Sequence, residues 1–107
     1  MLACEWRPRA QVDRESIAIY LGQEMGNPQA ALQAIRAIDA ALAFVCEFPF
    51  AGHPIIDDML EADGYRWWQA GRYKIVYTAT DAVLTVWRVY HERQDIADYA
   101  AVSVEGR

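Results

Sequence analysis

The chain has 107 residues and a formal net charge of −5, with 54% hydrophobic and 23% charged residues. This length predicts a single domain over residues 1–107, and the negative charge argues against a protein that grips nucleic acid through a basic surface. No run approaches the roughly 20 apolar residues of a membrane span, and we expect no secretory signal. Cys4 and Cys46 follow no metal-binding or disulfide pattern, so we expect reduced thiols in or near the core of a cytoplasmic protein.

The first part of the chain predicts a short strand followed by a helix. Residues 2–6 can form the strand, and Pro8 suits the first turn of the helix, where its missing N–H costs no hydrogen bond. Gly26 is a typical helix end, and Asn27 followed by Pro28 is typical of an N-cap and the first position of a second helix. The first helix carries one apolar stripe, made of Ile17, Tyr20, Leu21 and Met25.

The second helix has apolar residues at alternating spacings of four and three, and it ends near Pro49. This stripe consists of Ala31, Ile35, Ile38, Leu42 and Val45. It could be a coiled-coil seam, but its length beside an amphipathic first helix favours an antiparallel helical hairpin packed on a sheet. The next segment, FPFAGHPIIDD, is broken by proline and glycine and predicts a loop.

From residue 65 the apolar pattern changes to a period of two, which predicts three successive strands over residues 65–69, 72–80 and 83–90. Short joins at Ala70-Gly71 and near Asp81-Ala82 predict hairpins, and residues 95–102 can form a short closing helix. Because helices and strands are segregated along the chain, we predict an α+β fold. Its order is a strand, an antiparallel helical hairpin, a three-stranded antiparallel meander and a C-terminal tail.

The alternation of side chains assigns the strand residues to two faces of the sheet. Since the hairpin can cover only one face, the simplest assignment places beneath it Tyr73, Ile75, Tyr77, Trp87 and Val89. The open face then carries Arg72, Lys74, Arg88 and Tyr90 beside Val76, Leu84 and Val86. Such a face could hold phosphates and bases, could dock a protein through its apolar residues, or could be covered by the C-terminal tail. Trp67 and Trp68 are adjacent, so they must face opposite sides, and at least one is expected at a surface.

The end of the third meander strand, VWRVYHERQDI, crowds polar groups at one corner. His91 can act there as a general acid or base, or it can close the strand by bonding a backbone carbonyl or Asp95. Arg93 and Asp95 can form a local ion pair, or Arg93 can contact a target. We favour the structural interpretation of His91.

Four segments resemble a known family: IAIYLGQEMGNPQAA, FPFAGHP, YRWWQAGRYKIVYTA and VLTVWRVYHERQDI. With the order of the elements, they resemble the RelE/ParE superfamily of type II toxin–antitoxin toxins over nearly the whole chain. GRYKIVY followed by RVYHERQDI is the most specific part, closest to the ParE, or plasmid-stabilisation, branch. The resemblance implies a small antiparallel sheet with a helical hairpin on one face. It also implies a cognate antitoxin that wraps and neutralises the toxin in a hetero-oligomer.

RelE-like members of this superfamily are ribosome-dependent endoribonucleases, which need cations at the scissile phosphate and groups that move protons. By resemblance, Lys74 stands where that branch has an arginine, and Glu92 stands where it has a basic residue, with Arg93 adjacent. Tyr99 is a weak counterpart of a late tyrosine, and the acidic IIDDMLEAD replaces a lysine-rich stretch. With His91 added, the endoribonuclease candidates are Lys74, His91, Arg93 and Tyr99, which form an incomplete set.

ParE-like toxins lack that machinery, and the resemblance implies that they act by binding DNA gyrase. We therefore favour a ParE-like toxin that binds a protein target over an enzyme, which would be an endoribonuclease. The alternatives are a RelE-like mRNA endoribonuclease acting at the ribosome and a non-toxic relative that only binds protein. We expect no metal, no cofactor and no membrane association. The antitoxin is expected as a helix along the hairpin or a strand on the sheet edge, folding as it binds. The predicted target or antitoxin contacts are Arg72, Lys74, Val76, Leu84, Val86, Arg88, Tyr90 and Arg93.

Overall fold

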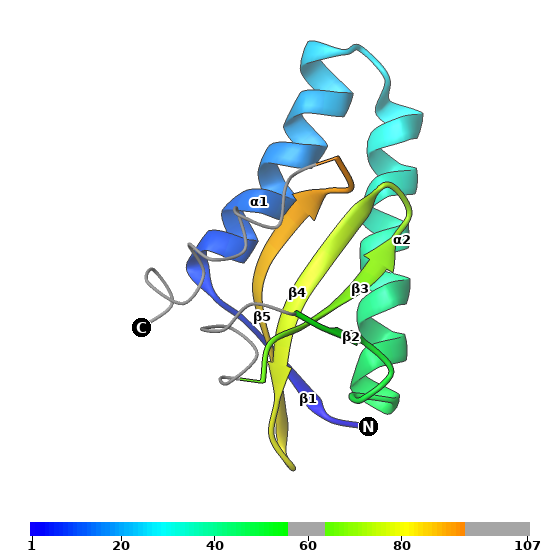
Figure 1. Ribbon diagram of the computed structural model, residues 1–107. Helices are drawn as coiled ribbons and strands as arrows, with labels where there is room; N and C mark the ends of the chain where they lie inside the picture. The colour runs from blue at the N-terminus through cyan, green and yellow to red at the C-terminus, as the bar shows by residue number, and fades with distance from the viewer. Residues whose placement is uncertain (56–63, 94–107) are drawn as a thin grey trace.

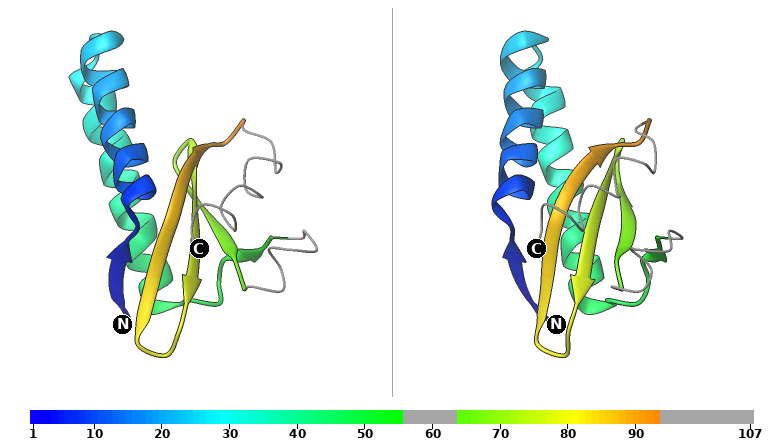
Figure 2. Two further views of the ribbon diagram at one scale, coloured as in Figure 1. Left: turned by 90° about the vertical axis from the view of Figure 1, so that its left-hand side faces the viewer. Right: turned by 60° about the vertical axis from the view of Figure 1, so that its left-hand side comes forward.

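The computed structural model describes residues 1–55 and 64–93, as two helices on one face of a five-stranded sheet (Figure 1, Figure 2). The strands are β1 (Ala3–Trp6), β2 (His53–Pro54), β3 (Arg66–Ala70), β4 (Tyr73–Ala79) and β5 (Val83–His91). The helices are α1 (Pro8–Ile19), which continues into the π-helical turn η1 (Tyr20–Glu24), and α2 (Pro28–Glu47). The predicted α+β fold, with its helical hairpin and three-stranded meander, is confirmed. The predicted closing helix and the tail over the open face lie outside the described residues.

The turn between the helices follows the local signals in the sequence. Gly26 has a positive φ of 61°, which glycine adopts without steric cost. The Asn27 side chain accepts a hydrogen bond from the Ala30 N–H at 3.0 Å, and Pro28 occupies the first turn of α2. This stop and start folds α2 back beside α1.

The sheet order is β1-β5-β4-β3-β2, with β1 parallel to β5 and all other neighbours antiparallel. The strand β2 lies inside the segment predicted as a loop, so that prediction was wrong for two residues. His53 pairs with Trp67 and Pro54 with Arg66 at the outer edge of the sheet. An edge position tolerates Pro54 because its missing N–H breaks no ladder on the open side.

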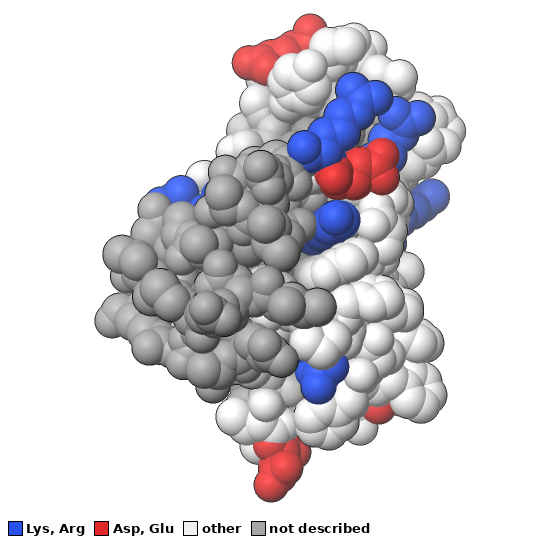
Figure 3. All heavy atoms as spheres, viewed as in Figure 1, with Lys and Arg blue, Asp and Glu red and all other residues white. Residues whose placement is uncertain are grey.

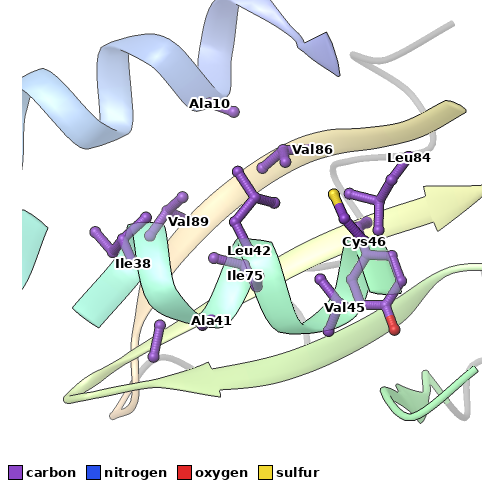
Figure 4. Close-up of a cluster of buried hydrophobic side chains, with 12 residues drawn as sticks. Ala10, Ile38, Ala41, Leu42, Val45, Cys46, Ile75, Leu84, Val86 and Val89 are labelled. Atoms are coloured by element: carbon purple, nitrogen blue, oxygen red, sulfur yellow. The ribbon is translucent and has the colours of Figure 1, made fainter. Parts of the chain in front are cut away.

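The main core lies between the helices and the sheet (Figure 4). Fully buried Ile38 and Val45 from α2 meet Ile75 and Tyr77 from β4. Ala10 of α1 is also fully buried, and its small side chain allows the helix to approach β5 closely. The helix-side core therefore joins all the long elements.

The helix α2 is long and apolar enough, by length and composition alone, to cross a membrane, which the sequence analysis did not anticipate. Core helices of soluble proteins pass the same test. One side of α2 contributes five buried residues to the core: Ile38, Ala41, Leu42, Val45 and Cys46. Its other side exposes Arg36 and Asp39. In this structure α2 is a core helix.

A β-bulge in β5 overturns part of the predicted face assignment. Val76 pairs with Arg88 while Tyr77 pairs with Val86, so Trp87 is an extra residue with no partner in this ladder. The extra residue reverses the alternation along the strand. Consequently Leu84 and Val86 lie fully buried under the helices, although they were expected on the open face. Trp87 lies on the opposite face, although it was expected beneath the helices.

The face away from the helices has a small core of its own. Its buried residues are Ile55, Tyr65, Val76 and Tyr90, with Trp67 and Trp87 packed against them. The Trp87 indole N–H donates to Thr78 Oγ1 at 2.9 Å, which fixes the bulged residue. The prediction that Val76, Leu84 and Val86 form an exposed apolar patch was wrong, because all three have 0% relative exposure.

Candidate functional site

The arginine expected to contact a partner, Arg88, is held by α1. Its Nε donates to Asp13 Oδ2 at 2.8 Å, and a terminal nitrogen donates to Oδ1 at 3.2 Å. The same carboxylate accepts the Val89 backbone N–H at 2.9 Å, and the guanidinium carbon lies 4.7 Å from the Tyr90 ring centroid. Both charged side chains are only 15% exposed. Arg88 therefore binds the helix to the sheet, and its charge is balanced within the fold.

The single lysine of the chain lies on the face of the sheet away from the helices, which we call the second face. Lys74 pairs with Tyr90, and its Nζ is 4.5 Å from the centroid of the Trp67 ring. This distance is within the range of a cation–π interaction. Arg72, at the turn before β4, is exposed, and its backbone carbonyl accepts the Glu92 N–H at 2.8 Å.

The polar corner after β5 is organised by local hydrogen bonds. The Arg93 N–H donates to His91 Nδ1 at 3.2 Å, and the His91 ring lies edge-on to Tyr73 at 5.5 Å. The Gln69 side chain donates to Glu92 Oε2 at 3.2 Å. His91 thus takes part in the local contacts that close the strand end. Asp95 and Tyr99 lie outside the described residues.

The described endoribonuclease candidates do not share one face of the sheet. His91 is directly opposite Tyr73, which packs against the helix-side core. Lys74 is opposite Tyr90, which belongs to the core of the other face. Directly opposed residues point to the same side and neighbours alternate, so Lys74 and His91 point to opposite sides. Of the predicted contacts within the described residues, Arg72 and Arg93 are exposed, while Val76, Leu84, Val86 and Tyr90 are buried.

A second feature, which the sequence analysis missed, is a continuous aromatic surface where α2 ends against β2 and β3. We call it the aromatic edge, and it consists of Phe44, Phe48, Phe50, His53, Trp67 and Trp68. The Phe44 ring lies 5.2 Å from Phe48 and stacks on Trp68 at 5.0 Å. His53 then links both tryptophans, at 5.9 Å from Trp68 and 4.5 Å from Trp67. The rings therefore run from the helix layer around the sheet edge to the second face.

Three phenylalanines of the aromatic edge are unusually open to solvent. Phe50 is 77% exposed, Phe48 51% and Phe44 40%. Figure 3 shows that the surface over the C-terminal half of α2 and the adjoining sheet edge carries few charges. An exposed apolar surface of this kind is typical of a contact site for another protein. Phe44 and Phe48, four residues apart and outside the buried stripe of α2, were the available sequence signal.

Arg66, at the start of β3, supports the aromatic edge by binding the loop before β2. Arg66 donates to the Gly52 carbonyl at 2.8 Å, and its guanidinium carbon lies 5.4 Å from the Phe50 ring centroid. These contacts hold Phe50 against the strand that carries the tryptophans. Arg66 is therefore a support for the aromatic surface.

The loop that carries Phe48 and Phe50 is anchored by Tyr77. The Tyr77 hydroxyl donates to the Pro49 carbonyl at 2.7 Å and accepts the Gly52 N–H at 3.0 Å. Burial raises the pKa of this tyrosine above its ordinary value, against the opposing effect of the Gly52 hydrogen bond. A Cβ added to Gly52 would overlap the hydroxyl and lie 2.8 Å from two ring carbons. The aromatic edge is thus positioned by the core.

A surface hollow of about 350 Å³ lies elsewhere, between the first strand and the two helices. It is lined by Trp6, Gln11, Arg14, Glu15 and Asp39, and it contains none of the candidate residues. Arg14 and Asp39 form an ion pair across it at 3.1 Å. In the part of the chain that the structure describes, no three histidine, cysteine, aspartate or glutamate residues are grouped as a metal site would require.

Comparisons with known proteins agree with this architecture. A family model for the ParE toxin of the type II toxin–antitoxin system, parDE, matches residues 4–96. A structure described as the chromosomal ParDE toxin–antitoxin system from P. aeruginosa is similar with a TM-score of 0.66 and 16% identity, over 85% of this chain and 96% of that chain. YafQ from E. coli strain BL21(DE3) is similar with a TM-score of 0.55 and 14% identity, over 86% and 94%. Among curated proteins the comparison found no sequence match.

The fold and the family model together define the class: a toxin of the RelE/ParE superfamily, from a type II toxin–antitoxin system. Within that class, the chain belongs to the ParE toxin family, whose model spans residues 4–96. Membership implies a cognate antitoxin as partner.

Proposed function

We propose that this ParE-family toxin acts in the cytoplasm by docking on a protein target, DNA gyrase. The observation that carries the proposal is that two cationic side chains are held by contacts within the fold, while aromatic side chains are exposed to solvent. Arg88 is paired with Asp13, while Lys74 lies on the Trp67 ring. Stabilising a scissile phosphate requires cations that converge on one point. A protein interface instead uses exposed aromatic anchors, such as Phe48 and Phe50.

The aromatic edge suits a protein target for a second reason. Tyr77 and Arg66 already hold the loop that presents Phe48 and Phe50. A surface that is already ordered before binding loses less conformational entropy when it binds, and this smaller entropic cost raises the affinity. The aromatic edge is therefore the docking surface that we assign to the target.

The antitoxin is assigned to the helical hairpin. Residues on its outer side are exposed and apolar: Val12, Ile19, Tyr20, Met25 and Leu32. A helix from the antitoxin can lay its apolar face along such a surface, folding as it binds. The exposed Arg72 and Arg93 would contact the antitoxin at the neighbouring corner.

A RelE-like mRNA endoribonuclease is the second candidate function. We keep this candidate because the fold is also similar to that of YafQ, a structure outside the ParDE system. Lys74, His91 and Arg93 would then be required for cleavage. The placement of Lys74 and His91 on opposite sides of the sheet argues against this candidate.

The experiment compares two activities of one preparation: inhibition of DNA supercoiling by gyrase, and cleavage of mRNA on translating ribosomes. The test variant is the double substitution Phe48→Ser with Phe50→Ser. The matched control is Val12→Ser, because Val12 is 55% exposed, close to the 51% of Phe48, and lies on α1. Thermal unfolding of each variant verifies that it is folded.

We expect the unmodified toxin to inhibit supercoiling and to accumulate cleaved DNA. The double variant should lose at least about tenfold in inhibition, since an aromatic anchor contributes on the order of 2 kcal/mol to binding. The Val12 control should retain inhibition. Ribosome-dependent mRNA cuts that disappear in Lys74→Ala or Arg93→Ala, without any effect on gyrase, would establish the second candidate instead.

A further inference from the structure

The two cysteines come from distant parts of the chain and approach the same buried residue. Cys4 in β1 is in parallel register with Leu84 of β5. Paired residues share a face of the sheet, so the Cys4 side chain lies on the helix side, where Leu84 is fully buried. Cys4 as a residue remains exposed at the outer strand of the sheet. Small oxidants therefore have access to it.

Cys46 reaches the same place from the last turn of α2. It is buried, and its side chain points toward Leu84 (Figure 4). Its backbone carbonyl accepts the Leu2 N–H at 2.9 Å, which joins the end of α2 to the chain two residues before Cys4. The backbone contact and the shared neighbour together bring the two thiols into proximity.

We propose that Cys4 and Cys46 are an oxidation site at which a peroxide closes a disulfide bond between β1 and the C-terminal end of α2. The Cys4 thiolate attacks the peroxide, which gives a sulfenic acid and releases water when hydrogen peroxide is the oxidant. The Cys46 sulfur then attacks the Cys4 sulfur, and a second water leaves with the sulfenic oxygen. Two thiols lose two electrons and two protons in total, and the peroxide is reduced to two waters.

Burial of Cys4, with a smaller contribution from the neighbouring thiol, limits the rate of this reaction. Burial, followed by the neighbouring Cys46 thiol, raises the pKa of Cys4 to about 11. Only a small fraction is thiolate at neutral pH, so closure should be slow there. Its rate should rise about tenfold per pH unit between pH 7 and pH 10, because the thiolate is the nucleophile.

The bridge would constrain the part of the fold that β1 secures. Within residues 1–55 and 64–93, β1 is an edge strand that pairs with β5 over the four pairs from Ala3–Val83 to Trp6–Val86. A disulfide from Cys4 to Cys46 would close a loop that contains all of α1 and most of α2. Such a bond limits the unfolded chain, and it should raise the melting temperature by on the order of 10 °C. This inference does not depend on which target the toxin binds.

The test is oxidation of the folded chain with hydrogen peroxide, followed by mass spectrometry of the denatured, unreduced protein. We expect a mass loss of about 2 Da, one peptide pair that joins Cys4 to Cys46, and reversal by dithiothreitol. Cys4→Ser should show neither the mass loss nor the rise in melting temperature. Cys46→Ser should behave in the same way as Cys4→Ser. If that variant fails to fold, peptide mapping of the oxidised chain without substitutions still shows whether Cys4 and Cys46 are joined.

Two results would overturn the proposal. One is accumulation of sulfinic acid on Cys4 while Cys46 remains a free thiol, which would mean that the second sulfur cannot reach the first. The other is a dimer linked through Cys4 of two chains. A closure rate that does not change between pH 7 and pH 10 would overturn the thiolate step specifically.

Discussion

Asp13 and Arg88 are 75 residues apart in the chain and form a two-pronged ion pair that joins α1 to β5. The Asp13 carboxylate also accepts the backbone N–H of Val89 at 2.9 Å. β1 pairs with β5 only as far as Val86, so no residue of β1 is paired with Val89. The Asp13 carboxylate accepts the Val89 N–H instead. The Asp13 side chain therefore accepts hydrogen bonds both from a backbone N–H at the edge of β5 and from the Arg88 guanidinium.

We expect Asp13→Ala to lower the free energy of unfolding by about 2–4 kcal/mol, because it removes the Asp13 carboxylate from a mostly buried guanidinium and from a backbone N–H. The matched control is Asp39→Ala, which breaks the ion pair with Arg14. Those two side chains are 55% and 36% exposed, so the control should cost less than about 1 kcal/mol. Urea unfolding measures both, and similar losses would contradict the structural role of Asp13.

Tyr77 provides a second prediction about the support of the aromatic edge. Tyr77→Phe removes the acceptor of the buried Gly52 N–H and the donor to the Pro49 carbonyl. We expect a loss of about 1–3 kcal/mol in unfolding free energy, together with faster amide exchange at Gly52. Tyr20→Phe is the control, since Tyr20 is 51% exposed and should tolerate the change. Unchanged exchange at Gly52 would show that the loop is held by other contacts.

The raised pKa of Tyr77 predicts a loss of stability in alkali. Burial is the main cause, and it favours the neutral hydroxyl in the folded state. The unfolded chain releases this proton near pH 10, while the folded chain still holds it. Stability is therefore unaffected by this group below about pH 10, and it falls above that pH by up to about 1.4 kcal/mol per pH unit.

The readout for this prediction is the slope of unfolding free energy between pH 10 and pH 11. Burial also raises the thiol pKa values of Cys4 and Cys46, which lowers stability in the same direction from a lower pH. Comparison with Tyr77→Phe separates the contributions, because the variant should have the shallower slope. Equal slopes would mean that the Tyr77 hydroxyl ionises in the folded protein as easily as in the unfolded chain.

The helical hairpin could be predicted because its signals are local. Gly26 adopts the positive φ for which glycine is suited, and Asn27 caps the next helix through its own side chain. Such signals act within a few residues and need no knowledge of the fold. The strand positions were predictable for a similar reason, since alternation reports a half-buried surface.

The bulge at Trp87 was beyond the reach of the sequence. An extra residue appears only when two strands are paired, because a single strand still alternates without interruption. The error moved Leu84, Val86 and Trp87 to the wrong faces and placed an apolar patch where none is exposed. The partner of Arg88 was hidden for a related reason, as Asp13 is on another element far along the chain. The aromatic edge likewise depends on His53, which meets the tryptophans only through β2 pairing.

Lys74 provides the prediction that separates the two candidate functions most directly. Lys74→Ala removes the ammonium that lies 4.5 Å from the Trp67 ring centroid, so it should cost about 0.5–1 kcal/mol of stability. If the toxin docks on gyrase through the aromatic edge, the concentration for half-maximal inhibition of supercoiling should change by less than about threefold, equivalent to about 0.7 kcal/mol. Arg72→Ala, at an exposed cation nearby, is the control for loss of charge alone. A folded Lys74→Ala protein that no longer arrests growth, while Arg72→Ala still does, would assign the ammonium to the active chemistry and favour the endoribonuclease.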